Sequence, residues 1–188
     1  MKFDNSFEVP LPPGDAWALL QDVRRIAPCM PGAELTEVLD ERSFKGKVAV
    51  KLGPVALSFA GTARFEEKDD AALMARVKAQ GTDQKGRGGA NAVVAFALVP
   101  VPGGTRVDIS TDLTLSGAVA QYGRGAGIIQ AVASELIGQF SEALRARIAR
   151  DAPAMQAAAP APVVTPIGGF GLIWRVLLGW LRRVFGRG

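Results

Sequence analysis

The chain has 188 residues, 48% of them apolar, which suits one globular domain with an appendage and excludes global disorder. It has no histidine and one cysteine, which excludes Ser-His, Cys-His and His-metal sites as well as intrachain disulfides. The net charge of +4 is uneven, because all 18 acidic residues lie between Asp4 and Asp151. The excess belongs to the C-terminal tail, with Arg175, Arg182, Arg183 and Arg187. This distribution argues against a nucleic-acid footprint over the domain.

The N-terminal segment predicts one strand and two short helices. Residues 2–9 alternate between polar and apolar and end at a cluster of prolines, as a strand would. Asp15 and the apolar residues after it predict a short helix, and residues 22–29 predict a second one. The first residues lack the apolar core of a signal peptide, so we expect the body of the protein in the cytoplasm.

From about residue 33 the apolar residues recur with a period of two. The alternation covers residues 43–52, 55–65, 72–80 and 105–116. Such a pattern predicts an antiparallel sheet with one buried and one solvated face. Residues 90–99 are apolar on both faces, so this strand is either covered on both sides or lies under another element.

A long amphipathic helix is predicted after the strands, because apolar residues recur every four positions from Ile128 to Ile148. Gly138 in its interior is interpreted as a close approach to the sheet or to a ligand. The glycine-rich residues 122–127 lack the Lys-Ser/Thr ending of a phosphate loop, so we interpret them as a flexible lead-in to the helix. Residues 83–89 are interpreted as a hairpin loop.

The order of these elements predicts an α+β domain over residues 1–150, with a curved seven-stranded antiparallel sheet around one long C-terminal helix. Small residues on the inner face would keep the sheet from closing tightly on the helix, so we expect an apolar ligand cavity. The sheet residues expected to line it are Phe59, Phe65, Val77, Val94, Phe96 and Leu113. The helix residues expected to line it are Ile129, Val132, Leu136 and Phe140. Each of these side chains fits an ordinary core equally well.

The last 38 residues predict a linker and a membrane-binding helix. Residues 151–169 are rich in Pro and Ala and predict a flexible linker, whereas residues 170–188 predict a basic amphipathic helix. Its membrane-binding residues are Phe170, Ile173, Trp174, Arg175, Leu177, Leu178, Trp180, Leu181, Arg182, Arg183, Val184 and Phe185. A helix of about 24 Å is shorter than a hydrocarbon core of about 30 Å, so we expect it to lie on the membrane surface. Docking on a protein partner and crossing of the membrane are the alternatives.

Few side chains are candidates for a catalytic role. Cys29 is interpreted as a small buried apolar side chain, because no histidine can activate it. The acidic side chains that could serve in acid–base work fall on outward strand positions or turns and predict a solvated face. They are Glu66, Glu67, Asp108 and Asp112.

Several motifs follow one another in residues 1–150. They are Phe7-Glu-Val-Pro, Ala16-Trp-Ala-Leu-Leu-Gln-Asp, Cys29-Met-Pro-Gly-Ala, Lys45-Gly-Lys-Val-Ala-Val-Lys-Leu-Gly-Pro and Gly123-Arg-Gly-Ala-Gly-Ile-Ile. With them the chain resembles the CoxG-like family, named after the G subunit of carbon monoxide dehydrogenase, within the SRPBCC or helix-grip (Bet v 1/START-like) superfamily. The resemblance implies an apolar cavity and no catalytic motif. It also implies an accessory protein that links a molybdenum hydroxylase, commonly carbon monoxide dehydrogenase, to the membrane and binds quinone.

Three functions are open at this point. In the first, a non-catalytic protein on the cytoplasmic face of the membrane binds menaquinone or ubiquinone in its cavity and couples the hydroxylase to the membrane. In the second, it is a membrane tether or assembly factor without ligand transport. In the third, it is a small-molecule cyclase or hydrolase, which the absence of histidine and the single tyrosine disfavour.

Overall fold

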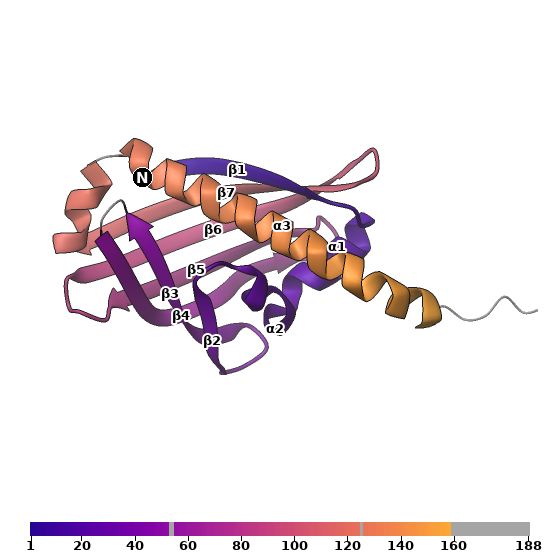
Figure 1. The fold of residues 1–188 in the computed structure, drawn as a ribbon, viewed down its shortest axis with the longest axis horizontal. Coiled ribbons are helices and arrows are strands. Elements are labelled where there is room, and N and C mark those ends of the chain that lie inside the picture. Colours follow the sequence, from indigo (N-terminus) through magenta and orange to yellow (C-terminus); the bar gives the residue numbers. More distant parts are fainter. Residues whose placement is uncertain (53–54, 125, 159–188) are drawn as a thin grey trace, which may run out of the picture. The chain divides into compact units, whose positions relative to one another are not determined.

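A computed structural model describes residues 1–52, 55–124 and 126–158 of the protein (Figure 1). Within these ranges, the strands form one antiparallel seven-stranded sheet in the order β1-β7-β6-β5-β4-β3-β2. The strands are β1 (Lys2–Val9), β2 (Ala33–Val38), β3 (Ser43–Leu52), β4 (Val55–Asp69), β5 (Met74–Asp83), β6 (Gly88–Val101) and β7 (Gly104–Gly117). The helices are α1 (Pro13–Gln21), α2 (Val23–Ile26) and α3 (Ala126–Ala158), with 3₁₀ turns η1 (Ala27–Cys29) and η2 (Ala118–Arg124).

Local sequence positions the two short helices. Pro13 occupies the first turn of α1, where its missing N–H and fixed φ suit a helix start. Asp22 ends α1 and caps α2, because its side chain accepts a hydrogen bond from the backbone N–H of Arg25 at 3.1 Å. The indole Nε1 of Trp17 donates to Oδ1 of Asp70 at 2.8 Å, which lowers the pKa of Asp70 and attaches α1 to the turn between β4 and β5.

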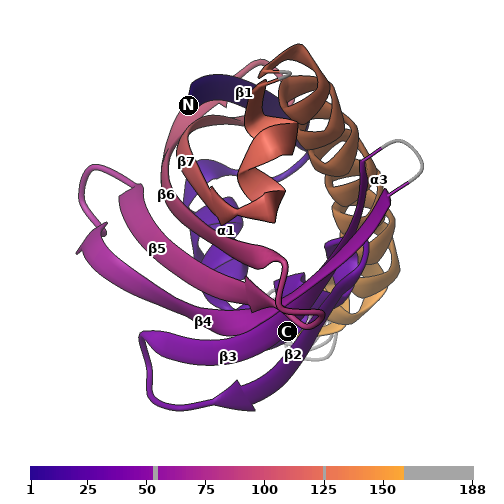
Figure 2. The ribbon, with the colours of Figure 1, turned by 90° about the vertical axis from the view of Figure 1, so that its left-hand side faces the viewer.

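Neighbouring strands approach each other closely where glycine replaces a side chain on the concave face. A Cβ atom added to Gly61 would overlap the carbonyl oxygen of Gln80 on β5. One added to Gly46 would lie 2.8 Å from the carbonyl oxygen of Glu34 on β2. Bulges in β2 and β4 add local twist. The sheet therefore curls strongly, with α3 beside the space that it encloses (Figure 2).

Two clusters of buried side chains stabilise opposite ends of the sheet. The first core cluster comprises Phe7, Val9, Ala16, Trp17, Leu19, Leu20, Cys29, Phe65, Ala75, Leu98, Val107, Phe140, Leu144 and Ile148. The second comprises Leu52, Leu57, Val119 and Ile129. On β4, Gly61 and Ala63 separate Leu57 of the second cluster from Phe65 of the first. The small residues of the concave face thus lie between the two clusters.

Within the described residues, the predicted strands and helices are confirmed in type and order, and Cys29 is buried as expected. The strand predicted at 43–52 has these bounds, whereas β4 runs four residues beyond the predicted end at residue 65, to Asp69. Its polar extension pairs with β5 through the exposed ion pairs Arg76–Glu67 at 3.5 Å and Lys78–Glu66 at 3.7 Å. Apolar alternation could not reveal this part of the strand.

Two details of the long helix differ from the prediction. The predicted apolar stripe includes Ile128, but 58% of the surface of this residue is exposed. The interpretation of Gly138 as a close approach is wrong, because a Cβ atom added there would meet no atom within 4 Å. Gly138 lies four residues after the exposed Ser134 and four before the exposed Glu142, on the outer side of α3.

The helix also extends beyond its predicted end. Residues 151–158, predicted as the start of the linker, belong to α3. Four of these eight residues are alanine, the residue with the highest helix propensity, which offsets part of the cost of Pro153. Residues 159–188 lie outside the described ranges.

A buried ion pair attaches the β5–β6 hairpin to β4. The carboxylate of Asp83 is fully buried and accepts hydrogen bonds from Nε of Arg87 at 2.8 Å and from its Nη2 at 2.9 Å. It also accepts one from the backbone N–H of Ser58 at 3.3 Å, while Arg87 donates to the carbonyl of Ala56 at 2.9 Å. The hydrogen bonds from Arg87 hold the pKa of Asp83 far below its usual range.

We therefore expect Asp83→Asn to lower the melting temperature by several degrees at pH 7. Since the folded pKa of Asp83 is depressed, its ionised form stabilises the fold above the unfolded pKa of 3.8, and this contribution is lost as the pH falls further. The difference between the two proteins should shrink below about pH 4 in scanning calorimetry. The control is Asp112→Asn, in an exposed ion pair, which should shift the melting temperature little at any pH. A difference that does not change with pH would contradict this role of Asp83.

Gly61→Ala should lower the free energy of unfolding by about 3 kcal/mol, because the new methyl group overlaps backbone and forces the strands apart. Gly138→Ala is the matched control and should raise it by up to about 1 kcal/mol, because the site is open and Ala favours a helix. Urea denaturation measures both changes. Equal stability of the two variants would show that the close approach at Gly61 is unimportant.

Candidate apolar ligand site

An elongated apolar cavity, called the inner cavity below, lies on the concave face of the sheet. Its first lobe has a volume of about 330 Å³ and its second about 370 Å³. Val23, Ala27, Ala33 and Phe44 line both lobes, so the two adjoin. Each volume lies at the lower end of the range for small-molecule sites.

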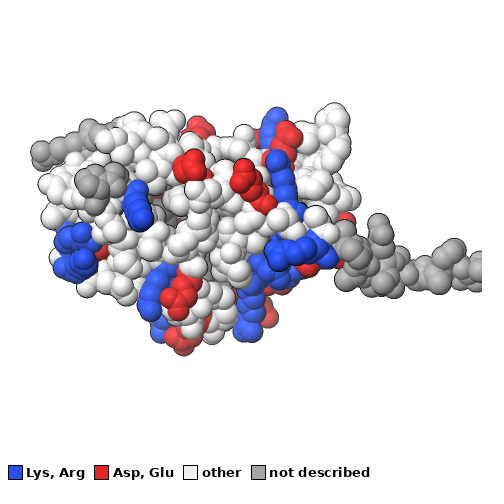
Figure 3. Space-filling model, viewed as in Figure 1, with Lys and Arg blue, Asp and Glu red and all other residues white. Residues whose placement is uncertain are grey.

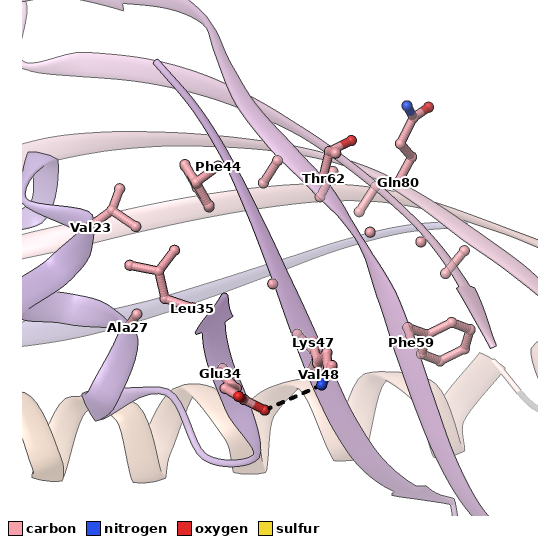
Figure 4. A pocket seen from close by; sticks show the side chains of 18 residues that line it. Val23, Ala27, Glu34, Leu35, Phe44, Lys47, Val48, Phe59, Thr62 and Gln80 are labelled. Atoms are coloured by element: carbon pink, nitrogen blue, oxygen red, sulfur yellow. Dashed lines mark ion pairs between the residues drawn. The ribbon is translucent and has the colours of Figure 1, made fainter. Parts of the chain in front are cut away.

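The first lobe lies over the small residues that separate the two core clusters. Strand register places Gly46, Gly61, Gly81 and Ala90 in one row across four strands. The next row holds Ala63, Ala79 and Ala92 beside Phe44. In Figure 4, Val23, Leu35 and Phe44 lie at one end of this lobe and Phe59 at the other. The alanines of the second row stay partly accessible although they face inward, so no other side chain fills the space above them.

The second lobe is lined by larger side chains and reaches α3. Five phenylalanines line it, namely Phe7, Phe44, Phe65, Phe96 and Phe140. The rings of Phe7 and Phe140 meet edge to face with centroids 5.5 Å apart, which fixes α3 against β1. Ile26 and Met30 contribute the wall opposite the sheet, and Thr111 contributes a hydroxyl group.

The first lobe opens beside β2 and β3. Val48 faces inward in register with Phe59, yet 39% of its surface is exposed. Glu34 and Lys47 lie at the margin of the lobe, and their charged groups are 3.9 Å apart (Figure 4). A ligand can therefore reach the apolar interior past one exposed ion pair.

The inner cavity offers burial rather than charge. Among the described residues that line the two lobes, the ionisable side chains are Glu34 and Lys47, which lie at the margin with side chains 67% and 45% exposed. No group of His, Cys, Asp and Glu side chains that could hold a metal ion occurs within the described ranges. On the face that carries α3, acidic and basic side chains are interspersed, and neither sign forms a continuous field (Figure 3). Such walls can recognise an apolar molecule by its shape.

The ten predicted wall residues lie in four different places in the structure. Phe65, Val77, Val94, Phe96 and Phe140 line the second lobe, and Phe59 lines the first. Ile129 belongs to the second core cluster, and Leu113 and Val132 pack against it. Leu136 is half-buried on α3 and lines neither lobe.

Sequence reasoning missed the wall formed by α2 and η1. It consists of Val23, Ile26, Ala27 and Met30. Their spacing of three, four and seven residues puts them on one face of a helix, and this period could have identified them. Strand alternation places Phe44 and Val48 on the inner face, so they too could have been identified.

The predicted membrane-binding residues, from Phe170 to Phe185, lie outside the described ranges. In the part of the chain that the structure describes, no helix combines the length and apolarity needed to span a bilayer.

Comparison with known proteins finds one family whose model matches the chain and several solved structures with the same fold. The model of the CoxG family, that of the carbon monoxide dehydrogenase G subunit, matches residues 6–149. A conserved protein from Geobacillus kaustophilus superposes with a TM-score of 0.69 at 20% identity, covering 80% of this chain and 97% of its own. No match was found among curated proteins.

Two further solved structures share the fold at lower identity. The Zhui aromatase/cyclase from Streptomyces sp. R1128 has a TM-score of 0.57 at 14% identity, covering 81% of this chain and 95% of its own. Ara h 8.0201 has a TM-score of 0.53 at 14% identity, covering 80% and 98%. At these identities the likeness establishes the helix-grip, Bet v 1-like fold alone.

Ala79→Leu tests whether the first lobe is empty. If it is, the added carbons fill free space, and the variant should be at least as stable as the parent, since each newly buried methylene contributes about 0.8 kcal/mol. In a filled core the same change would destabilise the protein by about 1–3 kcal/mol. Ala49→Leu, on the exposed outer face of β3, is the control. Urea denaturation decides between the two results.

Proposed function

The chain belongs to the CoxG family of carbon monoxide dehydrogenase G subunits, and on that premise we propose that it is a non-catalytic accessory protein that couples such an enzyme to the membrane. The partner is a molybdenum hydroxylase such as carbon monoxide dehydrogenase. The ligand is a respiratory quinone, menaquinone or ubiquinone, held in the inner cavity. The family supports the identity of the partner, and the helix-grip fold supports the binding of an apolar molecule.

The observation that carries this proposal is the inner cavity, whose first lobe lies between the two core clusters and whose second lobe is lined partly by the first cluster. A cavity lined by Gly and Ala on one side and by Phe on the other accepts an isoprenoid chain without unpaired polar groups. The carbonyl oxygens of a quinone ring need hydrogen-bond donors or water. Thr111 offers one hydroxyl in the second lobe, and the mouth beside Val48 offers water. The residues present therefore fit a quinone whose chain is buried.

The proposed location is the cytoplasmic face of the membrane, where quinone resides in the lipid. The basic amphipathic sequence of residues 170–188 supports attachment to that surface, since such helices bind by apolar burial and by attraction to anionic lipids. Oxidation of one CO with one water yields CO₂, two protons and two electrons. One quinone takes up two electrons and two protons to become a quinol, so the two half-reactions balance.

Coupling can be tested by following quinol formation with purified dehydrogenase, CO and vesicles that contain menaquinone. We expect the full-length protein to raise the rate at least tenfold, Ala49→Leu to keep that effect and Ala79→Leu to lose most of it. If Ala79→Leu is folded and as active as the parent, the cavity is not used. The protein would then be a tether or assembly factor.

Charge reversal at Arg175, Arg182 and Arg183 tests the attachment. Each basic residue near an anionic surface contributes about 1 kcal/mol, so changing all three to Glu should weaken binding to phosphatidylserine vesicles at least a hundredfold. The matched control reverses Lys45, Lys47 and Lys51 on β3 of the body and should change binding little. Co-sedimentation measures both. Unchanged binding of the tail variant would contradict attachment through the tail.

A further inference from the structure

The convex face of the sheet has an apolar strand that no described element covers. The outward side chains of β6 are Val93, Ala95, Ala97 and Val99, all partly accessible. The outward residues of β5 and β7 beside them are mostly polar, as a solvated face requires. In Figure 2 the outer side of β5 and β6 carries no helix. The sequence left two alternatives for residues 90–99, cover on both faces or a place under another element. The first is not met within the described chain, whereas α1 packs on the inner face, where the rings of Trp17 and Phe96 lie 6.0 Å apart.

A furrow of about 670 Å³ crosses this face, and we call it the outer furrow. Strand register explains it, because short side chains of β1, β7 and β6 lie in two adjacent rows. The first row holds Ser6, Asp108 and Ala97 and ends at Met74 on β5. The second row holds Asp4, Ser110 and Ala95 and ends at Arg76 on β5, which pairs with Glu67 at 3.5 Å. Met74, half exposed, stands at one end and the carboxylates stand near the other.

Of the two carboxylates that line the outer furrow, Asp108 has a basic partner and Asp4 does not. Asp108 accepts hydrogen bonds from Arg106 at 2.9 Å and 3.2 Å. Asp4 forms no ion pair with any described residue, and Ser6 and Ser110 offer hydroxyl groups beside it. A side chain that completes this surface would be a lysine or an arginine. It would be flanked by apolar groups that cover Ala95, Ala97 and Met74.

We propose that the outer furrow is the docking face for a protein partner that presents such a cationic side chain within an apolar surface. This inference rests on the proposed function, so the partner is the dehydrogenase. The concave face holds the inner cavity and its mouth beside β3, so a partner on the convex face leaves the mouth free. Docking there would let the protein hold its ligand and its enzyme at the same time.

Ala97→Arg and Asp4→Lys test the proposal by different means. The first fills the furrow with a long cation, and the second reverses the carboxylate that lacks a partner. Both should weaken binding of the full-length protein to purified dehydrogenase at least tenfold in biolayer interferometry. The matched control is Ala49→Arg, an outward alanine on β3 of the same face but away from the furrow, and it should stay within twofold of the parent. Retained melting temperature identifies the folded variants.

The remaining outcomes separate this inference from the proposed function. If the unaltered protein binds the dehydrogenase and both furrow variants bind equally well, the docking face is wrong and the proposed function stands. If the unaltered protein does not bind the dehydrogenase, the proposed partner and this inference both fail. If sedimentation shows a dimer of the unaltered protein that Ala97→Arg dissociates, a second copy occupies the furrow and the inference is wrong.

Discussion

The close approach of neighbouring strands at Gly46 and Gly61 is the constraint on which the rest of the structure depends. Since a side chain at Gly61 would overlap backbone, this position must stay bare. The glycines let neighbouring strands approach and the sheet curl, and they also leave little to fill the space beneath. Curvature and cavity therefore have one cause. An empty apolar cavity loses packing contacts along its walls, and a bound apolar ligand would recover part of them.

The two core clusters compensate for this open middle. One joins α1 and the C-terminal half of α3 to the sheet, and the other joins η2 to the β3–β4 end. Asp83 and Arg87 stabilise the same end as the second cluster by holding the β5–β6 hairpin to β4. The middle can therefore stay empty while both ends are fixed, which suits a protein that takes up and releases a ligand. The outer face of the same strands is free to serve a different partner.

Period-two alternation and the four-residue apolar repeat are sufficient to predict the sheet, the long helix and the concave face. These patterns cannot predict which inward residues line the cavity and which pack in a core cluster, because Phe65 and Leu113 are both apolar and both occupy inward positions of their strands. Register places Phe65 beside the second lobe and Leu113 against the second core cluster. They also cannot predict the end of β4, where ion pairs with β5 replace apolar contacts. The interpretation of Gly138 is wrong because the sequence reveals that a glycine lies within the helix but not which face of the helix it occupies.

The proposed function depends on a quinone bound in the inner cavity. The most direct measurement is mass spectrometry of an organic extract from the full-length protein, purified from its native host without detergent. We expect about one quinone per protein chain, and a markedly lower amount in the Ala79→Leu variant, whose larger side chain fills the first lobe. A ligand-free extract from a folded protein, or a quinone content unchanged by that substitution, would contradict it.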